Sequence, residues 1–212
     1  YVLQLARWRP VSRAADEDEP LPEALAALLD RCLAALPHAD ARTLVRASAA
    51  RYARAWRRHF SREHDPSAVR GERNVFRYRP CRRVIARGST TAALCQVVLA
   101  AGAANTPLTV SLPPDAARWA WLAECGGVEL VVEAEAGFVE RLGHPGDAER
   151  VRVWEPISAA ARAAANGTGV TVIDAPVLAN GRLELRWYLR EQTVSRLLHR
   201  YGSVMAQEES HA

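Results

Sequence analysis

Residues 84–112 read VIARGSTTAALCQVVLAAGAANTPLTVSL, and this stretch decides the fold. An apolar run at Val84–Arg87 is followed by a helical stretch over residues 89–103, and a second apolar run follows at Leu108–Leu112. Short apolar strands that alternate with helices of about ten to fifteen residues are typical of βαβ units, in which the strands lie parallel. The stretch therefore predicts an α/β fold with a parallel sheet.

The same alternation continues on both sides of this unit. Further strands are expected at Val75–Arg79, Val128–Glu133, Val151–Trp154 and Val170–Asp174. Further helices are expected at residues 114–124, 135–142 and 157–165. Residues 65–176 are therefore predicted to form one α/β domain.

A pair of helices is predicted ahead of this domain, within residues 21–64. Leucines recur every three or four positions up to Pro37, and the apolar stripe of the second helix ends at Phe60. Asp40 is the expected N-cap of the second helix. Residues 1–20 are interpreted as the tail of a preceding element and a polar, proline-bounded linker.

A β-hairpin flap and a final helix are predicted within residues 177–204. The dipeptide Asn180–Gly181 is typical of a tight hairpin turn and would lead into a strand at Leu183–Tyr188. A helix is expected over residues 191–201, and residues 205–212 are expected to be a frayed tail.

The composition limits the classes of function. The chain has 212 residues, 49% of them hydrophobic, which is enough for one domain with an appendage. No apolar run approaches the length of a membrane span, and no charged-then-apolar leader opens the chain. Because the chain begins at Tyr1 and not at Met, we interpret it as a fragment of a longer protein. A cytoplasmic location without a membrane partner is expected.

All 28 basic residues are arginine. A Walker A phosphate loop requires lysine and a Schiff-base enzyme requires an amine, so neither mechanism is available. The four cysteines lie far apart without a CxxC pair, which disfavours zinc and indicates reduced thiols. No cluster of histidines and carboxylates has the spacing of metal ligands, and no metal site is assigned.

The turn after the first strand of the quoted unit, Arg87–Thr91, is where a nucleotide phosphate would lie in a dinucleotide-binding fold. It contains one glycine, Gly88, whereas the dinucleotide fingerprint needs three. A plain strand-to-helix turn is expected, and no catalytic or cofactor-binding residue is assigned. A small independent Rossmann enzyme is therefore a disfavoured hypothesis.

Residues 70–87 contain seven arginines in RGERNVFRYRPCRRVIAR. In a strand through this stretch, Phe76 and Tyr78 would point to one face and Arg77 and Arg79 to the other. Single-stranded nucleic acids are bound by aromatic and cationic side chains on one shared surface. A free-standing, arginine-rich nucleic-acid-binding protein is therefore kept only as the alternative, with nucleic acid an improbable partner.

Three stretches together resemble the C-terminal end of long bacterial bifunctional enzymes that join a proline dehydrogenase to an L-glutamate γ-semialdehyde dehydrogenase. They are YVLQLARW at residues 1–8, RGERNVFRYRP at residues 70–80 and REQTVSRLLHRYG at residues 190–202. The resemblance implies a non-catalytic domain like a relict aldehyde dehydrogenase lobe, with a Rossmann-like sheet and a β-hairpin flap. Cys95, in ALCQV, does not match the nucleophile motif of that superfamily, which agrees with a relict.

The resemblance also implies partners and cofactors. FAD and NAD would be bound by upstream catalytic modules, with no cofactor in this segment. The domain would cover the cavity that carries the intermediate between the active sites. Arg70, Arg73, Arg77 and Arg79 are expected at the contact with those modules, because arginine is the usual cation of specific interfaces. A homo-oligomer is left open.

Overall fold

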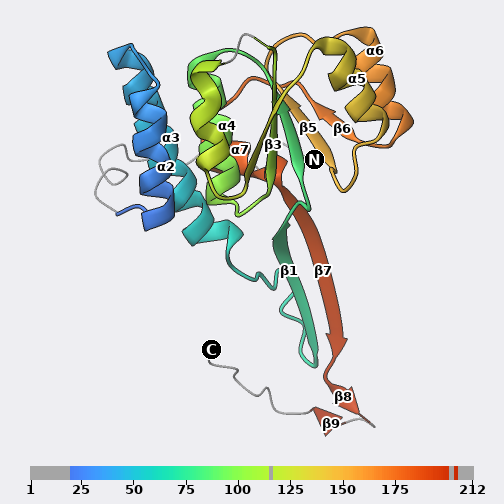
Figure 1. Ribbon diagram of the computed structural model, residues 1–212. Helices are drawn as coiled ribbons and strands as arrows, with labels where there is room; N and C mark the ends of the chain where they lie inside the picture. The colour runs from blue at the N-terminus through green and yellow to red at the C-terminus, as the bar shows by residue number, and fades with distance from the viewer. Residues whose placement is uncertain (1–19, 115–116, 201–202, 205–212) are drawn as a thin grey trace.

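The computed structural model describes residues 20–114, 117–200 and 203–204. A five-stranded sheet in the order β4-β3-β2-β5-β6 forms its centre, and all four strand pairs are parallel (Figure 1). The strands are β2 (Val84–Arg87), β3 (Leu108–Leu112), β4 (Val128–Val132), β5 (Arg150–Val153) and β6 (Thr171–Ile173). The chain builds outward from β2 to β4 and then returns to place β5 beside β2. This is the strand order of a Rossmann-like fold, and the predicted fold class is confirmed.

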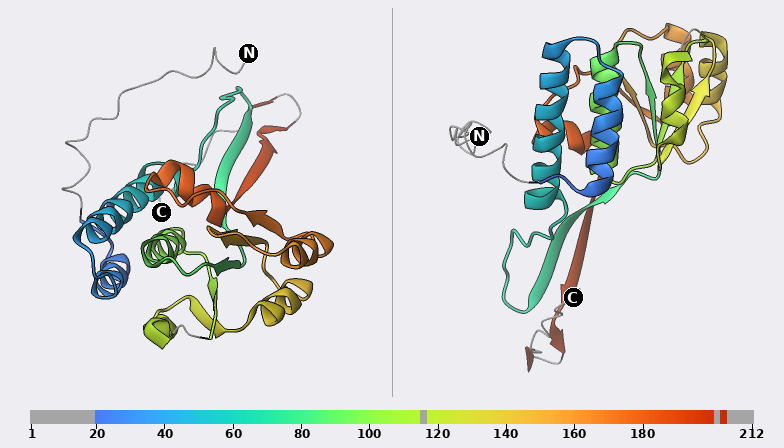
Figure 2. Two further views of the ribbon diagram at one scale, coloured as in Figure 1. Left: turned by 90° about the horizontal axis from the view of Figure 1, so that it is seen from above. Right: turned by 60° about the vertical axis from the view of Figure 1, so that its left-hand side comes forward.

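Helices cover both faces of the sheet (Figures 1 and 2). One face carries α4 (Thr91–Ala103), with α2 (Glu23–Ala34) and α3 (Ala39–Ala55) packed outside it. The other face carries α5 (Glu135–Gly143) and α6 (Ala159–Gly167). The predicted helical pair is thus confirmed, and it forms an extra layer on α4.

Two details of the predicted helices are wrong. His38, not Asp40, is the N-cap residue of α3, and Asp40 lies in the first turn. Residues 117–124 form a 3-10 helix where an α-helix was expected. Trp119, Leu122 and Cys125 are buried at intervals of three residues, which is the repeat of a 3-10 helix and not of an α-helix.

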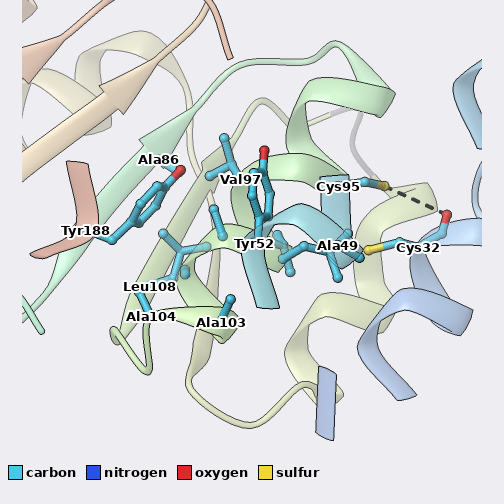
Figure 3. Packing of buried hydrophobic residues seen from close by; sticks show 14 of the residues in the cluster. Cys32, Ala49, Tyr52, Ala86, Cys95, Val97, Ala103, Ala104, Leu108 and Tyr188 are labelled. Atoms are coloured by element: carbon cyan, nitrogen blue, oxygen red, sulfur yellow. Dashed lines mark hydrogen bonds between the residues drawn. The ribbon is translucent and has the colours of Figure 1, made fainter. Parts of the chain in front are cut away.

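The alternation of side chains along β2 separates two apolar cores. Val84 and Ala86 point into the core beneath α4, whereas Ile85 packs with residues of α5 and α6. Nine of the thirteen residues of α4 are buried, because the sheet covers one side of this helix and the helical pair covers the other. Cys32 and Cys95 lie in this core, where the Cys95 thiol donates to the backbone oxygen of Cys32 at 3.8 Å (Figure 3).

A fully buried ion pair joins the sheet to the C-terminal part of the chain. Arg152 of β5 and Glu184 are both 0% exposed, and Arg152 Nε lies 3.0 Å from Glu184 Oε1. Arg152 also donates to the backbone carbonyls of Val153 at 3.0 Å, Ala175 at 2.6 Å and Pro176 at 3.1 Å. The guanidinium thus holds the segment that leaves β6.

The carboxylate of Glu184 accepts further hydrogen bonds besides those from Arg152. Glu184 accepts from the backbone N–H of Leu178 at 3.0 Å and from the Tyr188 hydroxyl at 3.2 Å. Tyr52 of α3 donates its hydroxyl to the Leu178 carbonyl at 2.6 Å. A buried charge is tolerated only when it is paired and fully hydrogen-bonded, and this network meets that requirement.

The hairpin predicted at Asn180–Gly181 is wrong. The structure has a short helix α7 (Gly181–Glu184) followed by a 3-10 turn (Leu185–Tyr188). The Asn180 side chain accepts from the backbone N–H of Arg182, as a helix cap does. A Cβ on Gly181 would collide with the Arg51 carbonyl of α3, so this glycine is needed for close packing and not for a turn.

In place of the hairpin flap predicted within residues 177–204, two strands that are far apart in the sequence pair with each other. β1 (Glu72–Pro80) pairs antiparallel with β7 (Leu189–Leu197), from Glu72 opposite Leu197 to Pro80 opposite Leu189. The two strands form an arm that projects from the body of the domain (Figure 1). The helix predicted over residues 191–201 is therefore wrong, since its first seven residues, 191–197, belong to β7 and pair with β1 instead.

The remaining described residues form a small ladder of β8 (His199–Arg200) with β9 (Ser203–Val204). The predictions for residues 1–19 of the tail and linker and for residues 205–212 lie outside the described residues.

Replacement of Arg152 tests the role of the buried pair. The variant R152M should lower the free energy of unfolding by about 3–5 kcal/mol, because it leaves the Glu184 carboxylate buried without its cation. Urea unfolding followed by circular dichroism measures the change. The control is R162M, which breaks the exposed pair of Arg162 with Asp174 and should cost at most about 1 kcal/mol. Equal losses in the two variants would contradict the prediction.

Candidate functional site

The carboxyl edge of the parallel sheet is the first candidate site. β2 is flanked by β3 and β5, which begin the two halves of the sheet that extend in opposite directions. In sheets of this kind, ligands bind outside the carboxyl ends of the strands at that reversal point. The crevice would lie where Gly88 follows β2 and Trp154 follows β5.

The carboxylate of Glu155 lies at this point, against the start of α4. Its Oε1 accepts from the backbone N–H groups of Ser89 at 2.9 Å and Thr90 at 2.8 Å, and from the Thr90 hydroxyl at 2.7 Å. The Ser89 hydroxyl is 3.1 Å from the same oxygen. These are the donors with which a helix N-terminus binds an anion. Glu155 therefore takes the place that a phosphate would need.

The hydrogen bonds to Glu155 favour its charged form. Burial acts to raise the pKa of this carboxyl, but the hydrogen bonds from Thr90 and Ser89 outweigh burial and hold the pKa below its usual value. The carboxylate is therefore ionised at neutral pH and remains bound to the helix start as an internal anion.

The indole of Trp154 fills the remaining space over Gly88. A Cβ on Gly88 would collide with Cε2 of Trp154, so only glycine fits beneath the ring. In a dinucleotide-binding fold, a glycine at this turn lets the backbone approach the pyrophosphate. In this domain, the indole ring of Trp154 occupies the space that a Cβ on Gly88 would need.

Ion pairs occupy the rest of this edge. Arg87 donates to the Ser111 hydroxyl at 2.7 Å and lies 3.3 Å from Glu135. Glu133 accepts from Ser111 at 2.7 Å and pairs with Arg141 at 2.9 Å. These polar side chains are paired with one another, so they do not form a set directed at a ligand.

The cysteines do not form a catalytic centre. Cys32, Cys81, Cys95 and Cys125 are all buried, free thiols. The hydrogen bond with Cys95 and burial raise the pKa of Cys32 far above its usual value, and burial raises that of Cys81 to about 11. A thiolate is the reactive form of cysteine, so Cys32 and Cys81 are unreactive at neutral pH. Within the described ranges, no group of three or more histidines, cysteines and carboxylates could hold a metal ion.

His59 is also a structural residue. Its Nε2 lies 3.2 Å from the Tyr78 hydroxyl, and its ring lies 4.6 Å from that of His64. Burial, followed by the charge of Arg182, lowers its pKa to about 4. His59 is thus neutral at physiological pH and joins the end of the helical pair to the arm.

The four arginines predicted at a contact surface lie at the arm. Two of them form ion pairs with described residues, and two do not. Arg73 and Arg77 both pair with Glu63 at 3.0 Å, and Arg77 also donates to Gln192 at 2.7 Å. Arg70 and Arg79 are exposed and make no ion pair within the part of the chain that the structure describes. Arg73 and Arg77 therefore already have partners within the domain.

The sequence did not indicate the like charges that face each other along the arm. Arg79 lies opposite Arg190, and Arg73 lies opposite Arg196. These pairs arise because β7 is a strand beside β1, whereas a helix was predicted over residues 191–201. The predicted separation of faces agrees with the rings of Phe76 and Tyr78, whose centroids are 5.0 Å apart.

A pocket of about 500 Å³ opens between α2 and the turn before β4. Leu28, Val98 and Cys125 contribute to its lining, and the exposed pair of Arg31 with Glu124 borders it at 2.9 Å. It lies at the amino edge of the sheet, away from the filled crevice. No set of reactive groups converges on it.

These observations define a Rossmann-like α/β domain whose ligand crevice is filled by its own side chains and which carries a projecting two-stranded arm. The search for solved structures shows what the chain is similar to. Proline utilization A (PutA) from Corynebacterium freiburgense matches 95% of this chain with 29% identity and a TM-score of 0.60. A PutA structure with proline bound in remote sites matches 77% of the chain with 20% identity and a TM-score of 0.54, which shows a shared fold. The expected resemblance to these bifunctional enzymes is thereby confirmed.

The chain corresponds to 17% and 20% of the lengths of these two PutA chains. No family model matches the sequence. No curated protein matches it either. Among the described residues, no helix is both long and apolar enough to cross a membrane.

Substitution of Glu155 tests whether it acts as an internal anion. The variant E155Q should lower the free energy of unfolding at pH 7 by about 1–2 kcal/mol, because hydrogen bonds to a charged group exceed those to an amide. The folded-state pKa is depressed, so this contribution is present above the unfolded pKa of the carboxyl and is lost as pH falls through the folded pKa.

Urea unfolding of both proteins between pH 7 and pH 3 measures this dependence. The stability difference between wild type and E155Q should shrink steadily toward the acid end. The control is E140Q on α5, where the side chain is exposed, and it should change stability little. A difference that stays constant with pH would contradict the assignment.

Proposed function

We propose that this chain is a non-catalytic domain from the C-terminal end of a bifunctional proline-catabolic enzyme. It would pack over the cavity through which the intermediate passes between the two active sites and would support assembly of the enzyme. The similarity to PutA over 95% of the chain supports the choice of parent. The filled crevice carries the argument for a non-catalytic role, because a domain that bound a dinucleotide would need the space that Glu155 and Trp154 occupy.

The cofactors of such an enzyme would be bound outside this chain. FAD would belong to the proline dehydrogenase module and NAD to the aldehyde dehydrogenase module. The NAD site of the aldehyde dehydrogenase superfamily uses a lysine near the adenosine ribose, and its active site uses a nucleophilic cysteine. The absence of lysine from the chain and the buried position of Cys95 support this division. The four free thiols support a cytoplasmic location.

The arm is the proposed contact with the upstream modules. Like charges directly opposite each other destabilise a strand pair, and Arg79 faces Arg190 while Arg73 faces Arg196. Glu63 compensates Arg73, and Glu149 compensates Arg190 at 3.3 Å. Arg79 and Arg196 have no such partner among the described residues. Carboxylates on an adjoining module would neutralise these two arginines.

The apolar side chains of the arm support the same contact. Leu197 is 74% exposed, Val69 46% and Val194 41%. Two isolated strands are only marginally stable in water, because they bury little apolar surface. A projecting arm with exposed leucine and valine is therefore expected to be covered in the complete enzyme.

The nucleic-acid alternative finds little support in the arrangement of side chains. Tyr52 is 0% exposed and Phe60 3%, so the aromatic stripe of α3 and the turn after it belongs to the core. Tyr78 packs edge-on against Phe60, with centroids 4.8 Å apart. These rings are not available for stacking on bases.

Charge reversal on the arm tests the proposed contact. Arg77 also holds Gln192 and Glu63, so its replacement would disturb the arm itself, and Arg79 and Arg196 are the better choice. In the full-length enzyme, the double variant R79E/R196E should lengthen the lag before glutamate forms from proline. The reversed charges would repel the carboxylates of the adjoining module, and an arm that no longer docks there would let the intermediate escape. The lag is measured in the coupled assay.

The control for this experiment is R162E, which reverses a charge on α6 at the other side of the domain. It should leave the lag unchanged. A double variant with the wild-type lag and intact secondary structure would overturn the proposed contact.

Addition of NAD tests the filled crevice directly. The melting temperature of this chain should stay constant when NAD or NADH is added at millimolar concentration, since a ligand raises it only if it binds the folded state. An increase that grows with ligand concentration would revive the hypothesis of a small Rossmann enzyme.

A further inference from the structure

The pocket between α2 and the turn before β4 has the size and the lining of a small-molecule site. Its volume of about 500 Å³ falls within the range of ligand pockets, roughly 300–1,000 Å³. Four polar residues contribute to the lining, namely Arg31, Asn105, Thr106 and Glu124. The other lining residues are apolar side chains, glycines and Cys125. A pocket of this kind suits a ligand that is mostly apolar and carries one polar group.

The walls of the pocket extend from the surface to the core. Val98 and Leu108 belong to its lining and are both 0% exposed, so the pocket reaches the apolar core beneath α4. On the α2 side, a Cβ on Gly102 would lie 3.0 Å from Cδ2 of Leu28, which shows that α2 and α4 are in close contact there. On the β4 side, a Cβ on Gly126 would meet no atom within 4 Å. The turn before β4 therefore leaves room beside α2.

Arg31 supplies a cation at the mouth of the pocket. It lies in the last turn of α2, and its side chain is 45% exposed. Its Nη1 donates to Glu124 at 2.9 Å, whereas its Nε and Nη2 donate to no described residue. A guanidinium binds a carboxylate through two parallel N–H groups on one edge. The pair with Glu124 thus leaves the Nε–Nη2 edge of Arg31 available to a second carboxylate.

We propose that this pocket binds a small monocarboxylic acid with an apolar chain. The carboxylate would accept from the Nε–Nη2 edge of Arg31, and the chain would lie against Leu28 and Val98. Glu124 beside Arg31 makes the mouth neutral overall, which suits a single negative charge and disfavours a doubly charged phosphate. The site lies at the edge of the sheet opposite the filled crevice. It does not depend on the proposed function.

Isothermal titration of the 212-residue chain with sodium octanoate tests the site. Binding should saturate at one molecule per chain. Hexanoate should bind on the order of tenfold more weakly, because it buries two fewer methylene groups. Octan-1-ol, which has the same chain length without the charge, should also bind on the order of tenfold more weakly, since it lacks the charged hydrogen bonds to Arg31. Titrations without saturation, or equal affinities for octanoate and octan-1-ol, would overturn the proposal.

Substitutions on α2 test where the ligand lies. Ala27 is exposed and lines the pocket, so the larger side chain of A27F should obstruct the mouth and abolish octanoate binding. The matched control is A34F, an exposed position of the same helix outside the lining, and it should bind octanoate as the wild type does. Octanoate binding that A27F leaves unchanged would place the ligand elsewhere and overturn the proposal.

Substitutions of the ion pair test the assigned charge. R31Q should weaken octanoate on the order of tenfold and leave octan-1-ol unchanged, because only the acid uses the guanidinium. E124Q removes the neighbouring anion and should tighten octanoate about twofold to threefold. Both side chains are exposed, so this comparison remains decisive if A27F does not fold. Weaker octanoate binding in E124Q, or equal effects of R31Q on the acid and the alcohol, would contradict the proposed contact.

Discussion

The buried pair of Arg152 and Glu184 is the interaction on which the C-terminal third of the domain depends. A guanidinium in the middle of a parallel sheet requires hydrogen-bond acceptors on all sides, and the chain supplies them by folding residues 175–188 around it. That folding places Tyr188 in the core and directs Leu189 toward β1. The projecting arm therefore begins directly at this network, because Tyr188 donates to Glu184 and β7 starts at the next residue, Leu189.

The crevice at the carboxyl edge of the sheet is closed for a similar reason, because groups that need an opposite charge find it within the domain. Rossmann-like sheets leave unpaired N–H groups at a helix start beside the reversal point, and these groups need an anion. In this domain Glu155 provides the anion from the next strand of the sheet, and Trp154 removes the space beside it. The fold is retained while its ligand site is satisfied internally. A domain of this kind is suited to act through its surfaces.

Those surfaces are dominated by arginine. The arginines around the crevice and along the sheet are neutralised within the domain, as Arg87 and Arg141 are by Glu135 and Glu133. Arg79 and Arg196 of the arm and the exposed Arg42, Arg46 and Arg51 of α3 make no ion pair with a described residue. Unbalanced charge on an otherwise well-paired domain marks the places where other segments or modules are expected to bind.

The sequence by itself determined the parallel sheet and the helical pair, because short apolar strands and leucine stripes are local signals that packing reinforces. It also identified the crevice as lacking a glycine fingerprint, but not what fills it, since Glu155 and Ser89 are 66 residues apart. Only the tertiary structure decided residues 181–197. Asn180–Gly181 has the local preference of a hairpin turn, yet Glu184 must reach Arg152 and Gly181 must approach α3, so the segment is helical. The following residues became a strand because β1 offered an unpaired edge, and such long-range pairing leaves no periodic mark in the sequence.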